Sequence, residues 1–224
     1  MKVLLFGATG MVGQSALREC LVDPQVTAVT AVGRNVTGQQ HAKLHEIKQA
    51  NLLDLSAIEK QLTGFDACFF CLGISSAGMS EERYTAITYD LTLSVAKTLA
   101  RLNSQMTFIY VTGRGTDSTE KGRSMWARVK GRTENELLKL PFKAAYMFRP
   151  GGIIPRHGVR SKTKLYQAIY ILMRPFYPLL ERGFKSAMTS SDKVGRAMIV
   201  VSQRGYATPF IESDDINRIA SQHI

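Results

Sequence analysis

Short apolar runs alternate with amphipathic segments along most of this chain. Such runs, rich in β-branched or aromatic residues, are typical of buried strands. They occupy 2–7, 26–32, 66–73, 106–113 and 144–152, and the more polar segment 45–49 fits a further strand. Between them, apolar residues recur every three or four positions, as on one face of a helix. Helices are predicted at 11–22, from Ser56 and at 124–140, and along the stripe Ile87, Leu91, Val95 and Leu99.

This alternation predicts parallel strands joined by crossover helices, which is an α/β doubly wound parallel sheet. Residues 153–224 are less regular, so we expect a small irregular region on the substrate side of the sheet. Its predicted elements are a helical segment near 163–182, a helix from Ser191 or Asp192, a short strand at 208–211 and a terminal helix near 213–221. No linker or repeat separates the parts, so we expect a single domain over 1–224 with its core in 1–152.

Composition narrows the setting of the protein. The chain has 224 residues, is 45% hydrophobic and contains only three cysteines. Three irregularly spaced cysteines do not make a disulfide framework, and the pair in "CFFC" (Cys68 and Cys71) lies three apart on a strand, on opposite faces. The apolar N-terminus is too short for a signal peptide, and no apolar run of about 18 residues is present. We therefore expect a cytoplasmic protein without a redox or membrane-spanning segment.

A glycine-rich turn joins the first strand to the first helix. In "GATGMVG", Gly7 permits a tight turn, Gly10 leaves room for a pyrophosphate beside the backbone, and Gly13 lets the helix approach the sheet. The helix N-terminus then presents N–H groups to the phosphates. A glycine pattern alone is weak, but its position directly between a strand and a helix indicates a dinucleotide site and a Rossmann-like fold.

The end of the second strand indicates which dinucleotide is bound. NAD sites place a carboxylate there to bind the ribose 2′-hydroxyl. In "AVGRNVT" there is no acidic residue, and Arg34 stands in that zone. A guanidinium pairs with a 2′-phosphate, so the sequence favours NADP(H) over NAD(H). The competing interpretation is that Arg34 is one more surface charge of a basic protein.

These motifs resemble the atypical short-chain dehydrogenases/reductases, specifically the Tat-interacting-protein-like branch near the NAD(P)-dependent epimerase/dehydratase group. The resemblance covers about 1–152 and rests on "GATGMVG", "VGR", "FFCLG", "YVTGRGTDS", "VKGRTENEL" and "FRPGGI". It implies a cofactor site in which each position has a role. The pyrophosphate would lie among Gly7, Thr9, Gly10, Met11 and Val12, and the 2′-phosphate would lie on Arg34. The adenine would contact Asn51 and Leu52, and the adenosine ribose would contact Leu72 and Gly73. The nicotinamide would lie beside Pro150 and Gly151. Asn51 stands where the family usually has Asp.

The resemblance also implies catalytic positions, and one of them departs from the family. Thr112 falls where a catalytic serine or threonine is expected, and Lys130 matches the active-site lysine. The tyrosine expected one turn before the lysine is replaced by Trp126. A phenol with a lowered pKa exchanges the proton as hydride moves, whereas an indole N–H does not titrate usefully. The alternative for Lys130 is a solvated helix lysine paired with Glu134, and for Trp126 a packing ring.

Other proton donors are considered. Tyr166 and Tyr170 lie at helical spacing in the substrate-pocket segment, and Tyr84 and Tyr89 have a similar claim, but tyrosines at such spacing usually pack in a core. No His/Cys/Asp/Glu spacing indicates a metal site.

The charge excess bears on partners. With 29 Lys and Arg against 18 Asp and Glu, the formal net charge is +11. The segment 155–164 is basic and is followed by apolar residues, which fits recognition of an anionic substrate, peripheral membrane contact through 155–182, or a solvated loop. No nucleic-acid motif accompanies the charge, so nucleic acid is not expected. The oligomeric state is left open.

Two functions remain. The first is an NADP-dependent oxidoreductase acting on a small carbonyl or sugar-like substrate. The second is a catalytically weak or inactive protein that senses NADP(H) and regulates a partner. The glycine turn and Arg34 support both equally.

Overall fold

A seven-stranded parallel sheet forms the centre of the molecule. The structure is a computed structural model and describes residues 1–159, 177 and 186–222. The strand order is β3-β2-β1-β4-β5-β6-β9, and every neighbouring pair is parallel. The strands are β1 (Lys2–Phe6), β2 (Ala28–Gly33), β3 (Leu44–Lys48), β4 (Ala67–Phe70), β5 (Thr107–Val111), β6 (Ala144–Arg149) and β9 (Phe210–Glu212). A separate pair, β7 (Gly152–Ile154) and β8 (Met188–Ser190), is also parallel.

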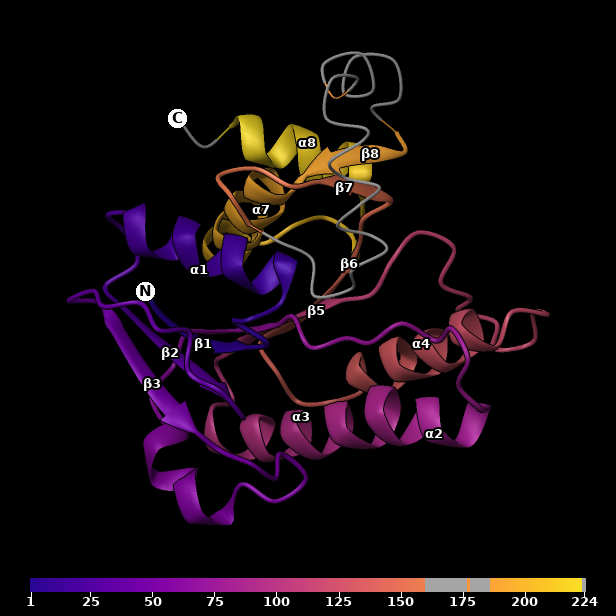
Figure 1. Cartoon of the computed structure of the whole chain (residues 1–224), viewed down its shortest axis with the longest axis horizontal. Helices are drawn as coiled ribbons and strands as arrows, with labels where there is room; N and C mark the ends of the chain where they lie inside the picture. The colour runs from indigo at the N-terminus through magenta and orange to yellow at the C-terminus, as the bar shows by residue number, and fades with distance from the viewer. Residues whose placement is uncertain (160–176, 178–185, 223–224) are drawn as a thin grey trace.

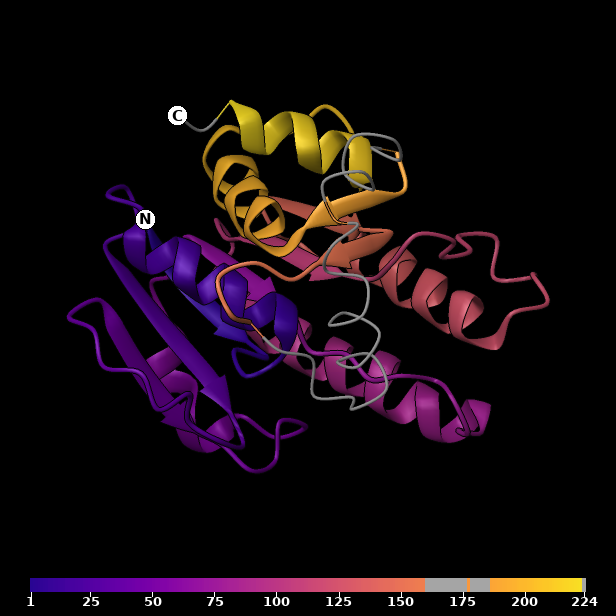
Figure 2. The same ribbon diagram turned by 45° about the horizontal axis from the view of Figure 1, so that its top comes forward.

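Helices cover both faces of the sheet. Figures 1 and 2 show α1, α7 and α8 on one face and α2, α3 and α4 on the other. The bounds are α1 (Met11–Val22), the 3₁₀ helix η1 (Ser56–Leu62), α2 (Glu81–Thr85), the π-helical turn η2 (Ala86–Asp90), α3 (Leu91–Leu102), α4 (Met125–Leu137), α7 (Ser191–Arg204) and α8 (Ser213–Ser221). The predicted α/β doubly wound, Rossmann-like fold is confirmed.

The core has two parts, one on each face of the sheet, and β1 contributes to both. Because side chains alternate along a strand, Val3 and Leu5 pack toward α1 and α7, whereas Leu4 and Phe6 pack toward α3. Such continuous apolar strands are expected where helices cover both faces of a parallel sheet.

The strand order reverses at β1, and in open α/β sheets such a reversal marks the edge where ligands bind. From β1 the chain proceeds to β2 and β3 on one side, and then returns to β4, β5 and β6 on the other. Helices on either side of such a switch point diverge, so ligands bind outside the carboxyl ends of the strands. All the strands are parallel, so the turns after β1, β2, β4, β5 and β6 meet along this carboxyl edge.

The helical stripe predicted from Ile87 is wrong in its first member. Val95 and Leu99 are fully buried, but Ile87 is 38% exposed. The π-helical turn η2 adds backbone within the helix and rotates the preceding residues, so Tyr84 and Thr88 face the core instead. The predicted helix near 163–182 lies outside the described residues.

Residues beyond 152 contribute more to the core than their irregular sequence indicates. The predicted strand at 208–211 corresponds to β9, which pairs with β6 and completes the sheet. α7 begins at Ser191 and packs closely on α1, where a Cβ on Gly195 would lie 3.1 Å from the Cα of Ala16. The segment therefore contributes α7 and α8 to one layer of the fold and β9 to the sheet.

Candidate functional site

The turn after β1 has the geometry that a dinucleotide requires. Gly7 has a φ of +82°, and a Cβ there would lie 2.7 Å from the Cys71 carbonyl carbon. A Cβ on Gly13 would lie 2.0 Å from the Gly7 carbonyl oxygen, so glycine is required for α1 to approach the turn. These two glycines are explained by the fold itself.

Gly10 has no such internal explanation. Its φ is −82°, a value that any residue adopts, and a Cβ there would come no closer than 3.4 Å to the Gly7 carbonyl oxygen. α1 begins at this point without a side-chain cap and without an acidic residue in its first turn. The space beside Gly10 and the uncapped N–H groups therefore form an open, positively polarised surface that suits a phosphate.

Arg34 follows the last residue of β2 and is exposed. Its side chain makes no hydrogen bond or ion pair within the described ranges 1–159, 177 and 186–222. The guanidinium lies one strand away from the glycine turn, since β1 pairs directly with β2. It is therefore free to meet a charged group that extends along this edge.

The remaining residues predicted for the cofactor site follow three other strands. Asn51 is exposed and Leu52 is buried after β3, whereas Leu72 and Gly73 follow β4. Pro150 and Gly151 follow β6, and Gly151 donates its backbone N–H to Ser213 Oγ at 2.9 Å. These six positions therefore lie in turns on the carboxyl side of the sheet.

Trp126 and Lys130 lie one turn apart on α4 and both face the loop that follows β5. The Trp126 six-membered ring lies beside Gly115, whose Cβ, if present, would be 3.6 Å from it. The Lys130 Nζ donates to the Thr112 carbonyl oxygen at 2.7 Å. Burial lowers the pKa of Lys130 to about 8, against the opposing effect of the Glu134 charge. This ammonium is thus held in place and is poised to change charge slightly above neutral pH.

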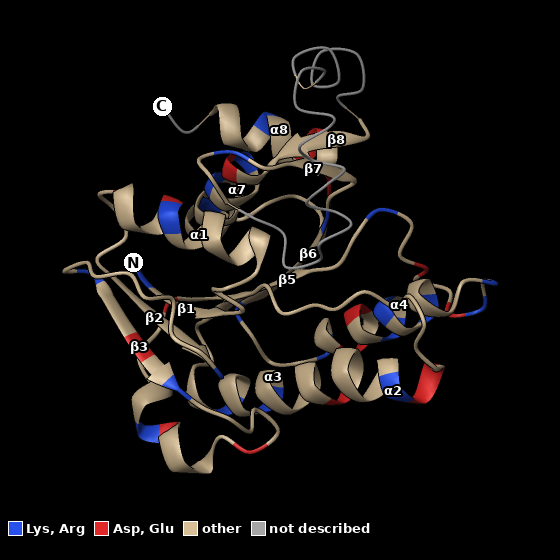
Figure 3. Cartoon of the chain, viewed as in Figure 1, with Lys and Arg blue, Asp and Glu red and all other residues tan. Residues whose placement is uncertain are grey.

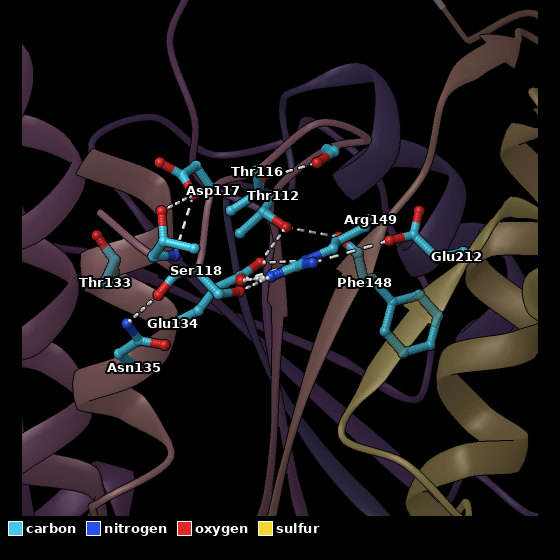
Figure 4. Close-up of polar contacts among 12 residues, drawn as sticks. Thr112, Thr116, Asp117, Ser118, Thr133, Glu134, Asn135, Phe148, Arg149 and Glu212 are labelled. Carbon is cyan, nitrogen blue, oxygen red and sulfur yellow. Dashed lines mark hydrogen bonds and ion pairs between the residues drawn. The ribbon is translucent and has the colours of Figure 1, made fainter. Parts of the chain in front are cut away.

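A buried ionic network lies behind this loop (Figure 4). Thr112 Oγ1 donates to Glu134 Oε1 at 2.6 Å, and Glu134 is completely buried. Arg149, at the end of β6, binds the same carboxylate through its Nε and Nη2 atoms. Arg149 also donates to Ser118 Oγ at 2.6 Å and lies 3.9 Å from the Glu212 carboxylate. The network therefore joins β5, α4, β6 and the start of α8.

This arrangement determines what Thr112 offers to a ligand. A threonine hydroxyl has one hydrogen to donate. The other neighbour of Thr112 Oγ1, the Phe148 carbonyl oxygen at 3.2 Å, is also an acceptor. The hydrogen is therefore committed to the Glu134 carboxylate, and Thr112 is not placed to polarise a substrate carbonyl. Glu134 pairs with Arg149 and Thr112 rather than forming the helix-surface pair with Lys130 considered above.

The other tyrosines considered as proton donors are differently placed. Tyr84 is 1% exposed, and burial raises the pKa of its hydroxyl despite a hydrogen bond with Thr88. Tyr89 lies under the Arg132 guanidinium, 4.3 Å from ring centroid to Cζ. Tyr166 and Tyr170 lie outside the described residues. Of the four tyrosines considered, the two that the structure describes are thus a buried hydroxyl and a ring held under a guanidinium.

The "CFFC" cysteines are separated by the sheet. Cys68 is buried in the α3-side core, whereas Cys71 packs on the α1 side. Burial raises the pKa of Cys71 to about 12 and that of Cys68 well above its usual value. Within the part of the chain that the structure describes, no group of three His, Cys, Asp or Glu side chains could hold a metal ion.

Charge and cavities elsewhere do not define a second site. Lys and Arg occur on helices of both layers and in loops (Figure 3). A cavity of about 520 Å³ lies between β8, α7 and α8, and includes Arg196 and Arg218 in its wall. Both guanidiniums are already paired, Arg196 with Asp192 and Arg218 with Asp215. Lys193 also lines the cavity, and Asp214 lies in the same wall, so its charge is mixed.

Comparison with known families identifies the fold's cofactor class. A family model described as NAD(P)H-binding matches residues 7–139. The chain belongs to this NAD(P)H-binding family. The match begins at the glycine turn and ends just beyond α4, so it contains the carboxyl-edge turns up to β5 together with Trp126, Lys130 and Glu134.

Curated relatives agree with the resemblance drawn from the sequence. Protein HTATIP2 of Rattus norvegicus is 25% identical over 155 residues, covering 69% of this chain and 62% of the rat protein. Protein FMP52-2, mitochondrial, of Scheffersomyces stipitis is 29% identical, covering 71% of this chain and 70% of its own length. Protein fmp52, mitochondrial, of Emericella nidulans is 26% identical over 88% of this chain and 85% of its own length. The predicted family is confirmed.

Solved structures with the same fold include sugar-nucleotide epimerases. A UDP-N-acetylglucosamine 4-epimerase from Methanobrevibacter ruminantium has a TM-score of 0.69 at 16% identity, covering 98% of this chain and 80% of the epimerase. A UDP-glucuronic acid 4-epimerase from Bacillus cereus, in complex with NAD, has a TM-score of 0.65 at 14% identity, covering 94% and 76%. At these identities the likeness establishes the fold.

The cytoplasmic location expected from the sequence is contradicted by the relatives. Four of them, from Scheffersomyces, Emericella, Aspergillus and Candida species, are named as mitochondrial proteins. The expectation failed because a low cysteine content indicates a reducing compartment but does not distinguish one such compartment from another. Among the described helices, none is both long and apolar enough to cross a membrane.

Sequence reasoning missed the two residues at the centre of the ionic network. Glu134, in "VKGRTENEL", was considered only as a surface partner of Lys130, and Arg149, in "FRPGGI", had no assigned role. The available signal was Arg149 itself, because a charged residue directly after the buried run "AAYMF" needs a partner at the same edge.

Proposed function

We propose that this chain binds NADP(H) along the carboxyl edge of its sheet and that phenol-dependent hydride transfer is weak or absent. The pyrophosphate would lie on the turn at Gly10, and the 2′-phosphate on Arg34. Lys130 would bind ribose hydroxyls, and Trp126 would form a wall of the nicotinamide pocket. The protein would then report the cofactor to a partner rather than turn it over.

The second part of this proposal, weak or absent hydride transfer, rests on the hydrogen bond that Thr112 donates to Glu134. Carbonyl reduction by this family needs a hydroxyl that polarises the carbonyl and a phenol that donates the proton. The Thr112 hydrogen is donated to the buried Glu134 carboxylate, and the phenol position holds Trp126. Both groups that activate a carbonyl are therefore absent or occupied, whereas the glycine turn and the exposed Arg34 remain open to a cofactor.

The experiment combines cofactor binding with turnover. Trp126 is the only tryptophan, so energy transfer from it to the dihydronicotinamide reports NADPH binding directly. We expect tight NADPH binding with negligible oxidation across a panel of aldehydes and ketones. Trp126→Tyr restores the phenol but leaves the Thr112 hydroxyl donated to Glu134, so any rise in turnover should stay below about a hundredfold, the lower end for general acid catalysis. Trp126→Phe, which supplies no phenol, is the matched control and should give no gain.

A second candidate, an oxidoreductase or epimerase-like enzyme on a small carbonyl or sugar-like substrate, is favoured by Lys130. Its lowered pKa and fixed Nζ are suited to a site where charge moves. The structural neighbours named as sugar-nucleotide epimerases suggest the substrate panel that should be included. Brisk native turnover that Trp126→Tyr leaves unchanged would favour this function over the first.

A further inference from the structure

Within the buried ionic network, Glu134 bonds both to Thr112, which contacts Lys130 of the predicted cofactor site, and to Arg149 at the end of β6. It lies one turn after Lys130 on α4, and its side chain has no exposed surface. Its carboxylate accepts from Thr112 on β5 and from Arg149 on β6 (Figure 4). A carboxylate without solvent contact requires such compensation, since an unpaired buried charge is costly.

Thr112 connects Glu134 to Lys130 through two different atoms. Its side-chain hydroxyl donates to Glu134 Oε1 at 2.6 Å, and its backbone carbonyl accepts from Lys130 Nζ at 2.7 Å. Fixing the hydroxyl fixes the χ1 angle of Thr112 and restrains the backbone at the end of β5. That backbone carbonyl accepts the hydrogen bond from the Lys130 ammonium, which links the position of the ammonium to the carboxylate.

The charges around Lys130 support the same connection. Glu134, on the same helix, is the charged group that acts on Lys130 and favours its protonated form. Arg149 faces Glu134 from β6, and Glu212 lies beyond Arg149 at the start of α8. Tyr110 on β5 is buried, and burial raises the pKa of its hydroxyl, so it stays neutral. Glu134 is thus the negative charge that offsets the burial of Lys130.

We propose that Glu134 is a positioning residue of the cofactor site: acting through Thr112, it fixes the Lys130 ammonium where the cofactor ribose is to bind. The contact between the Lys130 ammonium and the cofactor ribose rests on the proposed function. The effect on Lys130 itself does not, because it is a property of the protein without cofactor.

The first experiment measures Lys130 in the cofactor-free protein. The protein is labelled with ¹³C-lysine, and the Cε resonance of Lys130, assigned with Lys130→Arg, is followed by NMR from pH 6 to about 11. We expect a midpoint near pH 8 in the unmutated protein. Glu134→Gln should move it lower, because the offsetting charge is gone. Glu136→Gln, which removes an exposed partner of Lys139 on the same helix, should leave it unchanged.

An unchanged Lys130 midpoint in folded Glu134→Gln would overturn the proposal, whatever the loss of stability. If Glu134→Gln does not fold, Thr112→Val decides the question, since it removes the connecting hydroxyl and leaves the ion pair intact. We then expect a shifted or broadened Lys130 resonance, and recovery of the native signal in Thr112→Ser. A native Lys130 signal in Thr112→Val would equally overturn the connection.

The second experiment measures NADPH affinity by calorimetry. Glu134→Gln should weaken binding about tenfold, ~1.4 kcal/mol, whereas Glu136→Gln should not. In a Lys130→Met background, Glu134→Gln should have no further effect, because its route to the cofactor is already removed. Equal losses in both backgrounds would show a purely structural role. Absence of NADPH binding by the unmutated protein would contradict the proposed function but leave the NMR result valid.

Discussion

The two halves of the carboxyl edge are built on opposite principles. The half after β1 and β2 consists of backbone: a glycine turn, an uncapped helix N-terminus and one exposed, unpaired arginine. The half after β5 and β6 consists of buried side chains: a carboxylate and a guanidinium that hold each other and the loop between them. The first, open half leaves its polar groups available to a ligand, whereas in the second, closed half the polar side chains bond to one another.

This difference shows how binding and chemistry can be separated in one fold. Dinucleotide binding on the first half needs only the absence of side chains and the dipole of α1. Under the proposed function, chemistry on the second half would need side chains with free donors, whereas the Thr112 donor is committed and Trp126 stands where the family resemblance implies a phenol. A sequence can therefore lose one function without disturbing the other.

The largest expected effect comes from breaking the closed half. Arg149→Met leaves Glu134 buried without its cation, which should cost ~3–5 kcal/mol of unfolding free energy. The matched control is Arg101→Met, which removes the exposed partner of Glu59 and should cost at most ~1 kcal/mol. Urea unfolding followed by circular dichroism measures both. Similar losses in the two variants would mean that the buried network is no more important than a surface pair.

Substitutions in the open half should change cofactor affinity rather than the stability of the fold. Gly10→Val places a side chain in the space left for the pyrophosphate, so NADPH affinity should fall about a hundredfold, ~2.7 kcal/mol, with little change in melting temperature. Gly13→Val is the contrasting variant: its Cβ would lie 2.0 Å from the Gly7 carbonyl oxygen, so the fold itself should fail. Calorimetric titration and thermal melts measure both. Retained NADPH binding by Gly10→Val would mean that the turn holds no ligand.

The same contrast explains which parts of the site were predictable from the sequence. The glycine turn is local: three glycines within seven residues have a meaning that requires no knowledge of the rest of the chain. The network is non-local, since Thr112, Glu134 and Arg149 are separated by 22 and 15 residues and meet only because β5 and β6 are paired. Without the register of those strands, Glu134 resembles any helix-surface carboxylate.

The fold was predictable for a similar reason, and its exceptions are informative. The apolar strand patterns and their alternation with helices depend on neighbours in sequence, and they predicted the doubly wound sheet. The π-helical turn at Ala86–Asp90 has no comparable pattern, so the burial of Tyr84 in place of Ile87 was missed. Such turns are set by packing against other elements rather than by the local sequence.

Lys130 contacts the second half through Thr112, and its proposed contact with the cofactor should make NADPH binding depend on pH. Its pKa is lowered to about 8, so the ammonium is present below that pH and is lost as pH rises through it. If the charged form binds the cofactor, NADPH affinity should be constant up to about pH 7 and fall about tenfold per unit well above pH 8. Lys130→Met should abolish this dependence. A flat profile in the unmutated protein would place the cofactor away from Lys130.

The smallest expected effect concerns Arg34, the only charged side chain that the open half is proposed to use. Because Arg34 is exposed, its pairing with a 2′-phosphate should resemble a surface ion pair and contribute at most ~1 kcal/mol, or about fivefold in affinity. Arg34→Ala should therefore reduce the preference for NADPH over NADH about fivefold, with NADH affinity unchanged. Exposed charges are screened over about 8 Å at physiological ionic strength, so the preference should also shrink as salt is raised. Arg123→Ala, which removes an exposed arginine from the loop before α4, is the control for net charge. Equal NADPH and NADH affinities in the unmutated protein at low salt would remove the case for a 2′-phosphate site and leave the open half as a general dinucleotide cradle.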